Sequence, residues 1–434
     1  MSVKYVTMGL ISKVDKGAYS NIVLNDAFRE FFLSPKEKAF MTEIFYGVIR
    51  NKKFLDYIIE RYTKDIRKEW IRNLLRISIY QITFMNSDDK GVVWEATELA
   101  KKYSVAISKF INGTLRNYLR NKDSELKRLD DEKNYEVLYS IPRWFYDTLE
   151  KQYGNDNLKQ AITSLKKIPY LSVRVNKLKY SEEEFEEFLK EKDIQIIKKV
   201  DTVYYVNSGL IINSEEFKTG KIIAQDASSY LAAKNLGVMP NELVLDICAA
   251  PGGKTAVLAE EMKNSGEVIA IDIHQHKIKL IDTNMKKLGI DIVKAIVMDA
   301  RNVNKQGRKF DKILVDVPCS GYGVIRKKPE ILYSKNRENI EELAKLQLEI
   351  LNSAADILKD GGKLIYSTCT ITDEENTNNI KKFLEERKEF KVEKLHIPES
   401  VLGDYDKLGG FCINYKEEIM DNFYIIKLKK GEKC

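Results

Sequence analysis

The pattern that most constrains the fold begins near residue 242, where short apolar runs start to alternate with amphipathic segments. The runs are LVLDI (243–247), VIAIDI (268–273), AIVMD (295–299), KILVDV (312–317), KLIYST (363–368) and FYIIKL (423–428). Between them, apolar side chains at three- and four-residue spacing predict helices over Lys254–Met262, His274–Leu288, Arg337–Leu358 and Asp373–Glu386. Apolar strands that alternate with helices predict a mostly parallel α/β sheet covered on both faces. Such sheets bind ligands beyond the carboxyl ends of their strands.

The first third of the chain has a different pattern. From Leu24 to Leu119 apolar residues recur every three or four positions, most clearly in Phe40–Glu60, Trp70–Phe84, Trp94–Tyr103 and Ile107–Leu119. We therefore predict an all-helical domain over residues 1–130. Its basic residues form either an RNA-binding face or an ordinary solvated surface; they include Arg50, Lys52, Lys53, Arg72, Arg76, Arg116 and Arg120.

A small α+β module is predicted between the two larger parts. The charged stretch Asn121–Asn134 is expected to be a linker, and Pro142 to open a helix. LSVRVN (171–176) and TVYYVN (202–207) alternate like strands, and Ser181 is placed to cap a helix over 181–192. These elements assign residues 131–235 to the module and residues 236–434 to the sheet domain.

The composition excludes several classes of protein. The 434 residues carry a net charge of +7, which permits a polyanionic partner without requiring one. Five cysteines in so long a chain indicate a reducing compartment rather than a disulfide framework. The three histidines make a His-rich metal site or a Ser–His relay improbable, and no apolar segment reaches the ~18 residues of a membrane span. We expect a cytoplasmic monomer without metal.

The turn after the first predicted strand is CAAPGGKT, Cys248 to Thr255. A phosphate-binding P-loop would need Gly where Cys248 stands, and the dinucleotide pattern GxGxxG is also absent. A tight turn at a helix N-terminus remains, which could bind a carboxylate or an adenosine moiety. Asp272 ends the second strand, where it can accept both ribose hydroxyls, and Asp299 ends the third, where it can accept an adenine amino group. Adenosine binding without a phosphate loop indicates S-adenosylmethionine.

Two cysteines follow the next two strands of the predicted sheet. Asp316 and Cys319 follow the fourth strand, and Cys369 follows the strand that ends at Thr368. Thr372 and Glu375 have capping-box spacing, so a helix N-terminus is expected to lower the pKa of the Cys369 thiol. The basic run Arg326, Lys327 and Lys328 is expected to hold phosphates or to be a solvated surface. Structural or backbone roles are expected for Cys248, Cys412 and Cys434.

These motifs resemble the RNA cytosine-C5 methyltransferases of the NOL/NOP/Sun family. The resemblance lies in DICAAPGGKT (246–255), DIHQHK (272–277), DVPCSGYGVIRKKPEI (316–331) and YSTCTITDEEN (366–376), and extends to RVN (174–176) and GKIIAQDASSYLAA (220–233). EIFYGVIRNKKFLDYII (43–59) and AISKFINGTLRNYLR (106–120) are similar to a NusB-like RNA-binding domain. Two positions depart from the family pattern: Val317 replaces Ala, and the C-terminal segment has Asn422 for Gly and lacks a His.

The resemblance implies a NusB-like helical domain, a small α+β RNA-binding module and a Rossmann-like class I methyltransferase domain. It implies methyl transfer from S-adenosylmethionine to C5 of a cytosine in small-subunit (16S) ribosomal RNA. Cys369 would add to C6 of the base, Cys319 would assist its release, and Asp316 would hold the N3 edge. The cofactor would be held by Cys248, Ala249, Ala250, Pro251, Gly252, Gly253 and Lys254, with Asp272, Asp299 and Asp316.

Three alternatives compete with this reading. Transfer RNA is the runner-up substrate, because the motifs address the base and the cofactor but not the surrounding RNA. A non-catalytic RNA-binding factor is less expected, since Cys319 and Cys369 are both retained beside a complete turn. A P-loop nucleotide hydrolase conflicts with Cys248. DNA enzymes of the same chemistry place their nucleophile after the Pro of the fourth-strand motif and lack this Thr-Cys pair.

Overall fold

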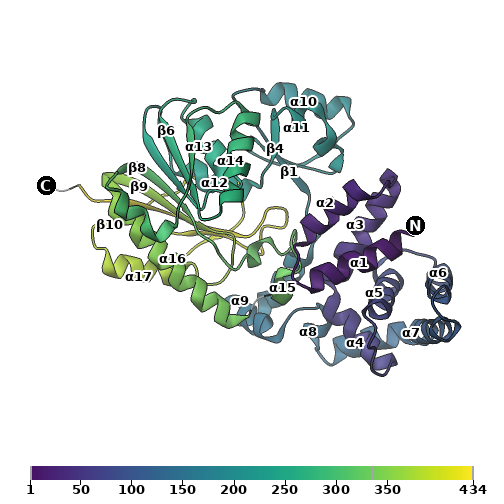
Figure 1. The fold of residues 1–434 in the computed structure, drawn as a ribbon. Helices are drawn as coiled ribbons and strands as arrows, with labels where there is room; N and C mark the ends of the chain where they lie inside the picture. The colour runs from purple at the N-terminus through teal and green to yellow at the C-terminus, as the bar shows by residue number, and fades with distance from the viewer. Residues whose placement is uncertain (1, 335, 433–434) are drawn as a thin grey trace. The chain divides into compact units, whose positions relative to one another are not determined.

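The computed structural model describes residues 2–334 and 336–432. The chain divides into two compact units, which are described separately (Figure 1). The first unit contains Met1–Lys166 together with Lys328–Lys335, and the second contains Lys167–Lys327 and Asn336–Cys434. We call them the helical unit and the catalytic unit.

The helical unit is built from amphipathic helices around one apolar core, which confirms the predicted all-helical fold. Ile44, Phe45, Leu74 and Leu75 are fully buried in this core. The helices are α1 (Val3–Asp15), α2 (Ser20–Glu30), α3 (Pro35–Arg50), α4 (Lys52–Tyr62), α5 (Glu69–Phe84), α6 (Asp89–Lys101), α7 (Val105–Asp131), α8 (Tyr135–Leu138) and α9 (Arg143–Lys166).

The linker expected at Asn121–Asn134 is wrong, because α7 continues through this stretch to Asp131. Leu129 is fully buried in the core, and Arg128 bonds to Glu125 and Glu132 at helical spacing. The charges therefore stabilise a helix instead of solvating a linker. In the described ranges, α7 included, no helix is both long and apolar enough to cross a membrane.

A short segment from far along the chain belongs to the helical unit. It includes α15 (Ile331–Ser334) and follows the Cys319 loop in sequence. The carboxylate of Glu330 accepts hydrogen bonds from the backbone N–H and the hydroxyl of Ser20, at 3.1 and 2.8 Å. The Tyr333 hydroxyl donates to the carbonyl of Ser140 at 2.8 Å. The Cys319 loop is thus followed directly by residues that are fixed in the helical unit.

The small module is an antiparallel sheet in the order β2-β3-β1-β4, packed on α10. Its elements are β1 (Leu171–Val175), α10 (Glu182–Glu191), β2 (Ile196–Val200), β3 (Val203–Val206), η1 (Gly209–Asn213), α11 (Glu215–Lys218) and β4 (Ile222–Ala224). The strands expected at 171–176 and 202–207 are confirmed, as is the Ser181 cap of α10. Sequence analysis missed β2 and β4.

Two residues of the RVN motif join this module to the large sheet domain. The buried guanidinium of Arg174 pairs with the buried carboxylate of Glu260 on α13 and donates to Gln225 at 2.6 Å. The Asn176 amide donates to the carbonyl of Leu288 at 3.0 Å. Both contacts lie inside the catalytic unit, so the motif fixes the module against the sheet domain.

The sheet domain contains a nine-stranded sheet within the described residues, in the order β11-β12-β13-β9-β8-β5-β6-β7, with β10 paired to β13. The strands β5, β6, β7, β8 and β9 are parallel, as predicted, and the C-terminal strands add an antiparallel edge. The strands are β5 (Leu243–Ile247), β6 (Glu267–Asp272), β7 (Val293–Val297), β8 (Phe310–Asp316), β9 (Leu358–Thr368), β10 (Phe390–Glu393), β11 (Asp404–Tyr405), β12 (Phe411–Ile413) and β13 (Phe423–Lys430).

Helices cover both faces of this sheet (Figure 1). On one face lie α12 (Ala227–Asn235), α13 (Gly253–Glu261) and α14 (Gln275–Leu288). On the other lie α16 (Arg337–Ile357) and α17 (Thr377–Glu386). Successive strand residues alternate between the two cores; for example, Val244 contributes to the first and Leu245 to the second. The carboxyl ends of the parallel strands carry the motif residues.

Candidate active site

Cys319 and Cys369 meet at the carboxyl edge of the sheet. They follow β8 and β9, which are parallel neighbours with Asp316 opposite Ser367. The two Sγ atoms lie 3.1 Å apart, at hydrogen-bond distance for sulfur. The structure thus brings together the two cysteines and Asp316, as their positions at neighbouring strand ends led us to expect.

A buried hydrogen-bond network fixes the backbone beside each cysteine. The hydroxyls of Ser320 and Thr370, the residues that follow the cysteines, lie 2.6 Å apart. The buried carboxylate of Glu375 accepts from the Ser320 backbone N–H at 2.8 Å and from its hydroxyl. Gln347 and Thr372 also donate to Glu375, at 2.9 and 2.7 Å. Because every donor reaches the same carboxylate, Glu375 holds the two cysteine loops together.

The helix expected to begin beside Cys369 begins later, so that prediction is wrong. Helix α17 starts at Thr377, and its N-cap residue Asn376 makes no side-chain cap bond. Glu375 forms no capping box, because its carboxylate is occupied by Ser320, Gln347 and Thr372. Thr372 and Glu375 have the sequence spacing of a helix cap. However, the Glu375 carboxylate binds Ser320, which lies 55 residues away in the chain, and not the start of a helix.

The environment of Cys319 disfavours its ionisation. The hydrogen bond with Cys369, followed by burial and the negative charges of Glu375 and Asp316, raises the pKa of the Cys319 thiol well above its usual range. Cys319 therefore keeps its proton and can donate it to the neighbouring sulfur. Of the two cysteines, Cys319 is therefore the less suited to act as a thiolate.

Asp316 is held by two donors that sequence analysis did not assign to it. The Lys254 ammonium lies 2.8 Å from Oδ2 of Asp316, and the Ser367 hydroxyl donates to Oδ1 at 2.7 Å. Burial lowers the pKa of Lys254, but Asp316 and the Cys369 side chain outweigh it and raise the pKa overall. Lys254 therefore stays cationic. Both donors lie inside the recognised motifs CAAPGGKT and YSTCT. Their place in these motifs was the sequence feature that could have indicated contact with Asp316.

The turn after β5 has the left-handed backbone that a tight approach to a ligand requires. Cys248 has a φ of +59° and Gly252 a φ of +99°. The φ of Gly252 requires glycine, and a Cβ at this position would also lie 3.1 Å from the Cε atom of Met285, a close contact that the flexible Met285 side chain would have to relieve. Gly252 is the N-cap of α13, as the predicted turn at a helix N-terminus demands.

Two of the predicted cofactor contacts are acidic residues at the ends of strands. Asp272 ends β6, is buried, and accepts a hydrogen bond from the His274 backbone N–H at 3.1 Å. Asp299 lies two residues beyond β7, and the hydrogen bonds it accepts from Arg301 lower the pKa of its carboxyl group. The ribose and adenine contacts of these residues stay predictions.

A buried acceptor at the end of β5 fits a cationic ligand. Oδ2 of Asp246 accepts from the Thr255 hydroxyl at 2.6 Å, whereas its buried Oδ1 has no hydrogen-bond partner among the described residues. Burial raises the pKa of this carboxyl group to about 7. S-adenosylmethionine carries an ammonium and a sulfonium group, so the acidic side chains and the glycine turn fit this cofactor.

The first two residues of the basic run after Cys319 have neither of the predicted roles, phosphate binding or a solvated surface. Arg326 is 1% exposed and donates to the carbonyls of Glu417 and Met420, both at 2.8 Å. Lys327 forms ion pairs with the buried carboxylates of Asp226 and Asp421, at 2.8 and 2.7 Å. These two cations are structural, and phosphate binding stays a prediction for Lys328 alone.

The divergent C-terminal segment packs directly on the cysteine loops. The Gly323 backbone N–H donates to the carbonyl of Cys369 at 2.9 Å, and the Asn422 backbone N–H donates to the carbonyl of Gly323 at 3.1 Å. A Cβ at Gly323 would lie 2.0 Å from the Asn422 carbonyl oxygen. Gly323 thus permits three backbone segments to meet beside Cys369, and the segment around Asn422 forms one wall of the site.

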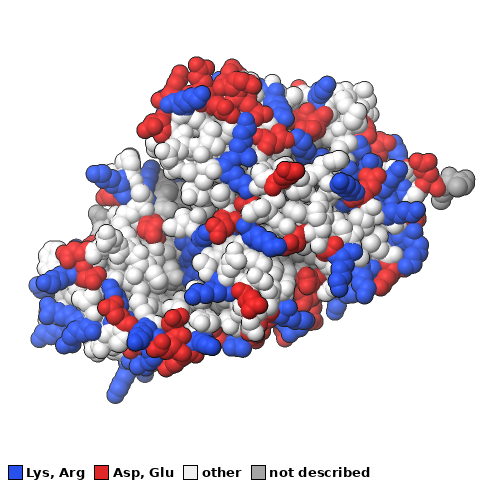
Figure 2. All heavy atoms as spheres, turned by 180° about the vertical axis from the view of Figure 1, so that it is seen from behind, with Lys and Arg blue, Asp and Glu red and all other residues white. Residues whose placement is uncertain are grey.

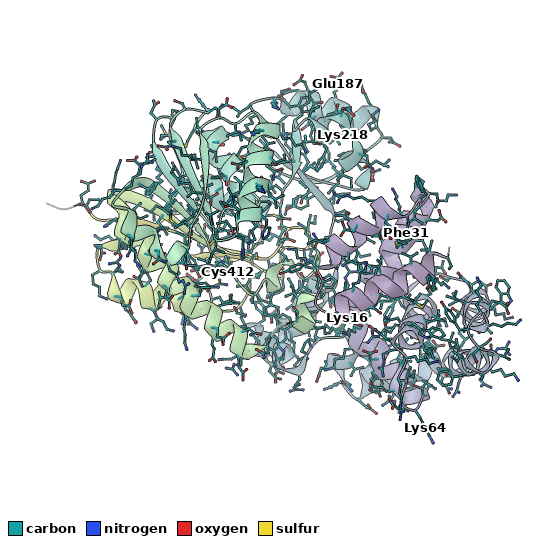
Figure 3. The ribbon with its side chains drawn as sticks, viewed as in Figure 1. Lys16, Phe31, Lys64, Glu187, Lys218 and Cys412 are labelled. Carbon is teal, nitrogen blue, oxygen red and sulfur yellow. The ribbon has the colours of Figure 1, made fainter. Side chains whose placement is uncertain are left out.

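The remaining cysteines have the properties of packing residues. Burial raises the pKa of Cys248 and of Cys412 to about 12 in each case. Cys412, labelled in Figure 3, lies on the antiparallel strand β12. Cys434 lies outside the described residues. No group of three or more His, Cys, Asp or Glu side chains in the described chain is arranged to hold a metal ion.

Family profiles match the chain along its length. Residues 1–120 match the NusB family, residues 141–215 the ferredoxin-like domain of RsmF/B-like methyltransferases, and residues 233–429 the 16S rRNA methyltransferase RsmB/F family. The sheet with its strand-end turn and the paired cysteines therefore define a class I methyltransferase domain, preceded by a NusB domain and a ferredoxin-like module.

Individual relatives extend the match to the whole chain. The probable ribosomal RNA small subunit methyltransferase B of Bacillus subtilis (strain 168) is 34% identical and covers 99% of both chains. The crystal structure of PH0851 superposes over 99% of both chains with a TM-score of 0.83 and 29% identity. A methyltransferase homolog protein from Pyrococcus horikoshii is 27% identical, with a TM-score of 0.61, over 68% of this chain and 98% of its own. The chain belongs to the RsmB family of ribosomal RNA small subunit methyltransferases.

Proposed function

We propose that this protein transfers a methyl group from S-adenosylmethionine to C5 of a cytosine in small-subunit ribosomal RNA, through a covalent bond between Cys369 and C6 of the base. The observation that carries the proposal is the 3.1 Å approach of Cys319 and Cys369 beside Asp316 at the ligand-binding edge of the sheet. The names of the relatives support ribosomal RNA as the substrate.

The proposed nucleophile is the Cys369 thiolate. C5 of cytosine is a poor nucleophile until a thiolate adds to C6, which makes C5 enamine-like. Cys319 lies 3.1 Å from Cys369 and keeps its proton, which supports Cys369 as the nucleophile and Cys319 as the residue that assists release. After methyl transfer, loss of the C5 proton allows the C6–S bond to break, which returns the electron pair to Cys369. Cys319 assists this release.

Asp316 is proposed to hold the N3 edge of the base, with Lys254 and Ser367 as its positioning partners. Addition at C6 increases the electron density on the ring, N3 takes up a proton from water, and the Asp316 carboxylate accepts a hydrogen bond from the resulting N3–H. The Lys254 ammonium and the Ser367 hydroxyl fix the two Asp316 oxygens in place. The low exposure of Lys254 keeps this charge pair strong.

The cofactor supplies an electrophilic methyl group when it is bound. The residues proposed to hold it are the turn from Cys248 to Lys254, Asp272 for the ribose hydroxyls and Asp299 for the adenine amino group. Asp246 adds a buried acceptor for a cationic group. Titration of an Asp272→Ala protein with S-adenosylmethionine tests this assignment, and unchanged affinity would remove Asp272 from the site.

Substitution of each cysteine tests the mechanism. Cys369→Ala is expected to abolish methyl transfer, because it removes the proposed nucleophile. Cys319→Ala is expected to accumulate a covalent protein–RNA adduct, visible as a shifted band after denaturing electrophoresis. Cys412→Ala is the matched control and should retain transfer without an adduct. Turnover by Cys369→Ala together with an inactive, adduct-free Cys319→Ala would reverse the two roles.

A further inference from the structure

A groove of about 780 Å³ opens between α6 and α7 of the helical unit. Helical spacing places Lys90 and Trp94 together on α6, and Arg116 and Arg120 together on α7. The complete lining is Lys90, Val93, Trp94, Thr97, Asn112, Arg116, Leu119 and Arg120. This lining, drawn from the described residues, combines three cations with one large aromatic ring and includes no carboxylate.

Trp94 is exposed although it has the largest apolar side chain on α6. It is 68% exposed, whereas the adjacent Val93 is 5% exposed and packs into the core. The hydrophobic effect disfavours such exposure in a side chain that serves only packing. An indole face open to solvent between cations is a surface on which a planar base can stack.

The cations of the groove differ in their ionic partners from those of a second cavity in the helical unit. Lys90, Arg116 and Arg120 are exposed, and none forms an ion pair with a described residue. By contrast, Lys52 and Lys53 line another cavity of the same unit but pair with Asp15 and Glu136. In Figure 2, basic side chains gather at the end of the helical unit that carries α6 and α7. The α6–α7 groove therefore presents uncompensated positive charge.

We propose that this groove binds an unpaired nucleotide segment of the RNA substrate, with one base stacked on Trp94 and phosphates held by Arg116 and Arg120. Single-stranded RNA binds to proteins through this combination of aromatic stacking and cationic contacts. The side-chain amide of Asn112 offers a donor and an acceptor to a base edge. The inference rests on the proposed function, because it takes the RNA substrate as the ligand.

Fluorescence of Trp94 tests the stacking directly. The chain has three tryptophans, so the full-length protein with Trp70→Phe and Trp144→Phe retains Trp94 as its only indole. Titration with a short oligouridine should quench this fluorescence, since the base covers the ring. Polyphosphate and polyglutamate carry charge without bases and should not quench it. Equal quenching by polyglutamate would assign the groove to an acidic peptide, and binding of oligouridine without quenching would also overturn the proposal.

Affinity measurements on otherwise native protein provide a second test. Trp94→Ala should weaken oligouridine binding by about tenfold or more, the usual effect of losing one stacked base. Phe110→Ala, exposed on α7 but outside the groove, is the matched control and should bind as the native protein does. Arg116→Ala should lower the slope of log affinity against log salt by about 0.7. Unchanged affinity and slope in these variants would contradict the proposal.

The two proposals can fail separately. If the native protein methylates ribosomal RNA but oligouridine does not quench the fluorescence of Trp94, the groove assignment is wrong and the proposed function stands. If oligouridine quenches Trp94 but no methyl group is transferred to any RNA, the groove binds RNA and the proposed function is wrong.

Discussion

Two basic clusters of this protein have similar residues but opposite environments. Arg326 and Lys327 follow the Cys319 loop and are occupied by buried carbonyls and carboxylates of the catalytic unit. Arg116 and Arg120 on α7 are exposed and form no ion pair with any described residue. The first cluster uses its charge to hold the fold together, and the second leaves its charge available to a polyanion.

The comparison shows that proximity to the catalytic motif does not make a cation a ligand-binding group. Lys327 is only eight positions from Cys319 in the sequence, yet both acidic partners of its ammonium come from distant segments. A buried carboxylate without a cation is costly, so Asp226 and Asp421 require Lys327. Burial and partners, rather than the number of basic residues, separate the two roles.

Removal of the cation that pairs with two buried carboxylates should have the largest effect. Lys327→Met keeps the length of the side chain but removes the ion pairs of Asp226 and Asp421, and breaking a buried pair typically costs about 3–5 kcal/mol of unfolding free energy. Chemical denaturation measures this loss. The neighbouring Lys328, which forms no ion pair with a described residue, is the control, and Lys328→Met should change stability by less than about 0.5 kcal/mol. Equal stability of the two variants would mean that the Lys327 pairs are not buried in solution.

Asp246 extends the comparison to a buried carboxyl group that forms no ion pair with a described residue. Because its folded-state pKa of about 7 exceeds the ordinary value of 3.8, the folded protein binds the extra proton, and stability falls as pH rises from about 4 to about 7. Asp246→Asn cannot ionise and keeps an oxygen for Thr255. It should therefore unfold at a higher temperature than the native protein at pH 8, and no higher near pH 4.

The size of this stabilisation follows from the difference between the folded and unfolded pKa values of Asp246. Each pKa unit corresponds to about 1.4 kcal/mol, so Asp246→Asn should raise the unfolding free energy at pH 8 by on the order of a few kcal/mol. Saturating S-adenosylmethionine should reduce the difference in stability between Asp246→Asn and the native protein at pH 8, because a cationic ligand stabilises the ionised carboxylate of the native protein. A stability difference that does not vary with pH would show that Asp246 does not change its ionisation on folding.

Removal of the exposed cations should have the smallest effect on stability. The double variant Arg116→Ala, Arg120→Ala should unfold within about 0.5 kcal/mol of the native protein, because neither side chain is buried or paired. For binding of this variant to single-stranded RNA, the slope of log affinity against log salt concentration should be smaller by about 1.4 than for the native protein. Each of the two lost phosphate contacts contributes about 0.7 to this slope. Arg67→Ala is the control, since Arg67 is exposed but lies outside the groove. Loss of stability without a change of slope would contradict the comparison.

Periodic features of the sequence predicted most of the fold. Apolar runs at 243–247 and 312–317 became β5 and β8, and Ser181 capped α10 as its spacing indicated. The positions of Cys319 and Cys369 at two strand ends predicted their approach, because parallel neighbours end at the same edge. These properties depend on local spacing and on one general rule of sheet topology.

Features that depend on distant partners were not predictable in this way. Glu375 had the spacing of a helix cap, but its carboxylate is used by Ser320. The stretch expected to be a linker is helical because Leu129 reaches the core. Lys254 was assigned to the cofactor turn, and only the structure places its ammonium on Asp316.

The most direct test of the central claim is methyl transfer from labelled S-adenosylmethionine to small-subunit ribosomal RNA and, in parallel, to transfer RNA. Bisulfite sequencing of both products would locate any new 5-methylcytosine. We predict one modified cytosine in the ribosomal RNA, absent with Cys369→Ala and retained with Cys412→Ala. Modification of transfer RNA alone would contradict the proposed substrate. Transfer to neither RNA by a protein that binds the cofactor would contradict the proposed activity.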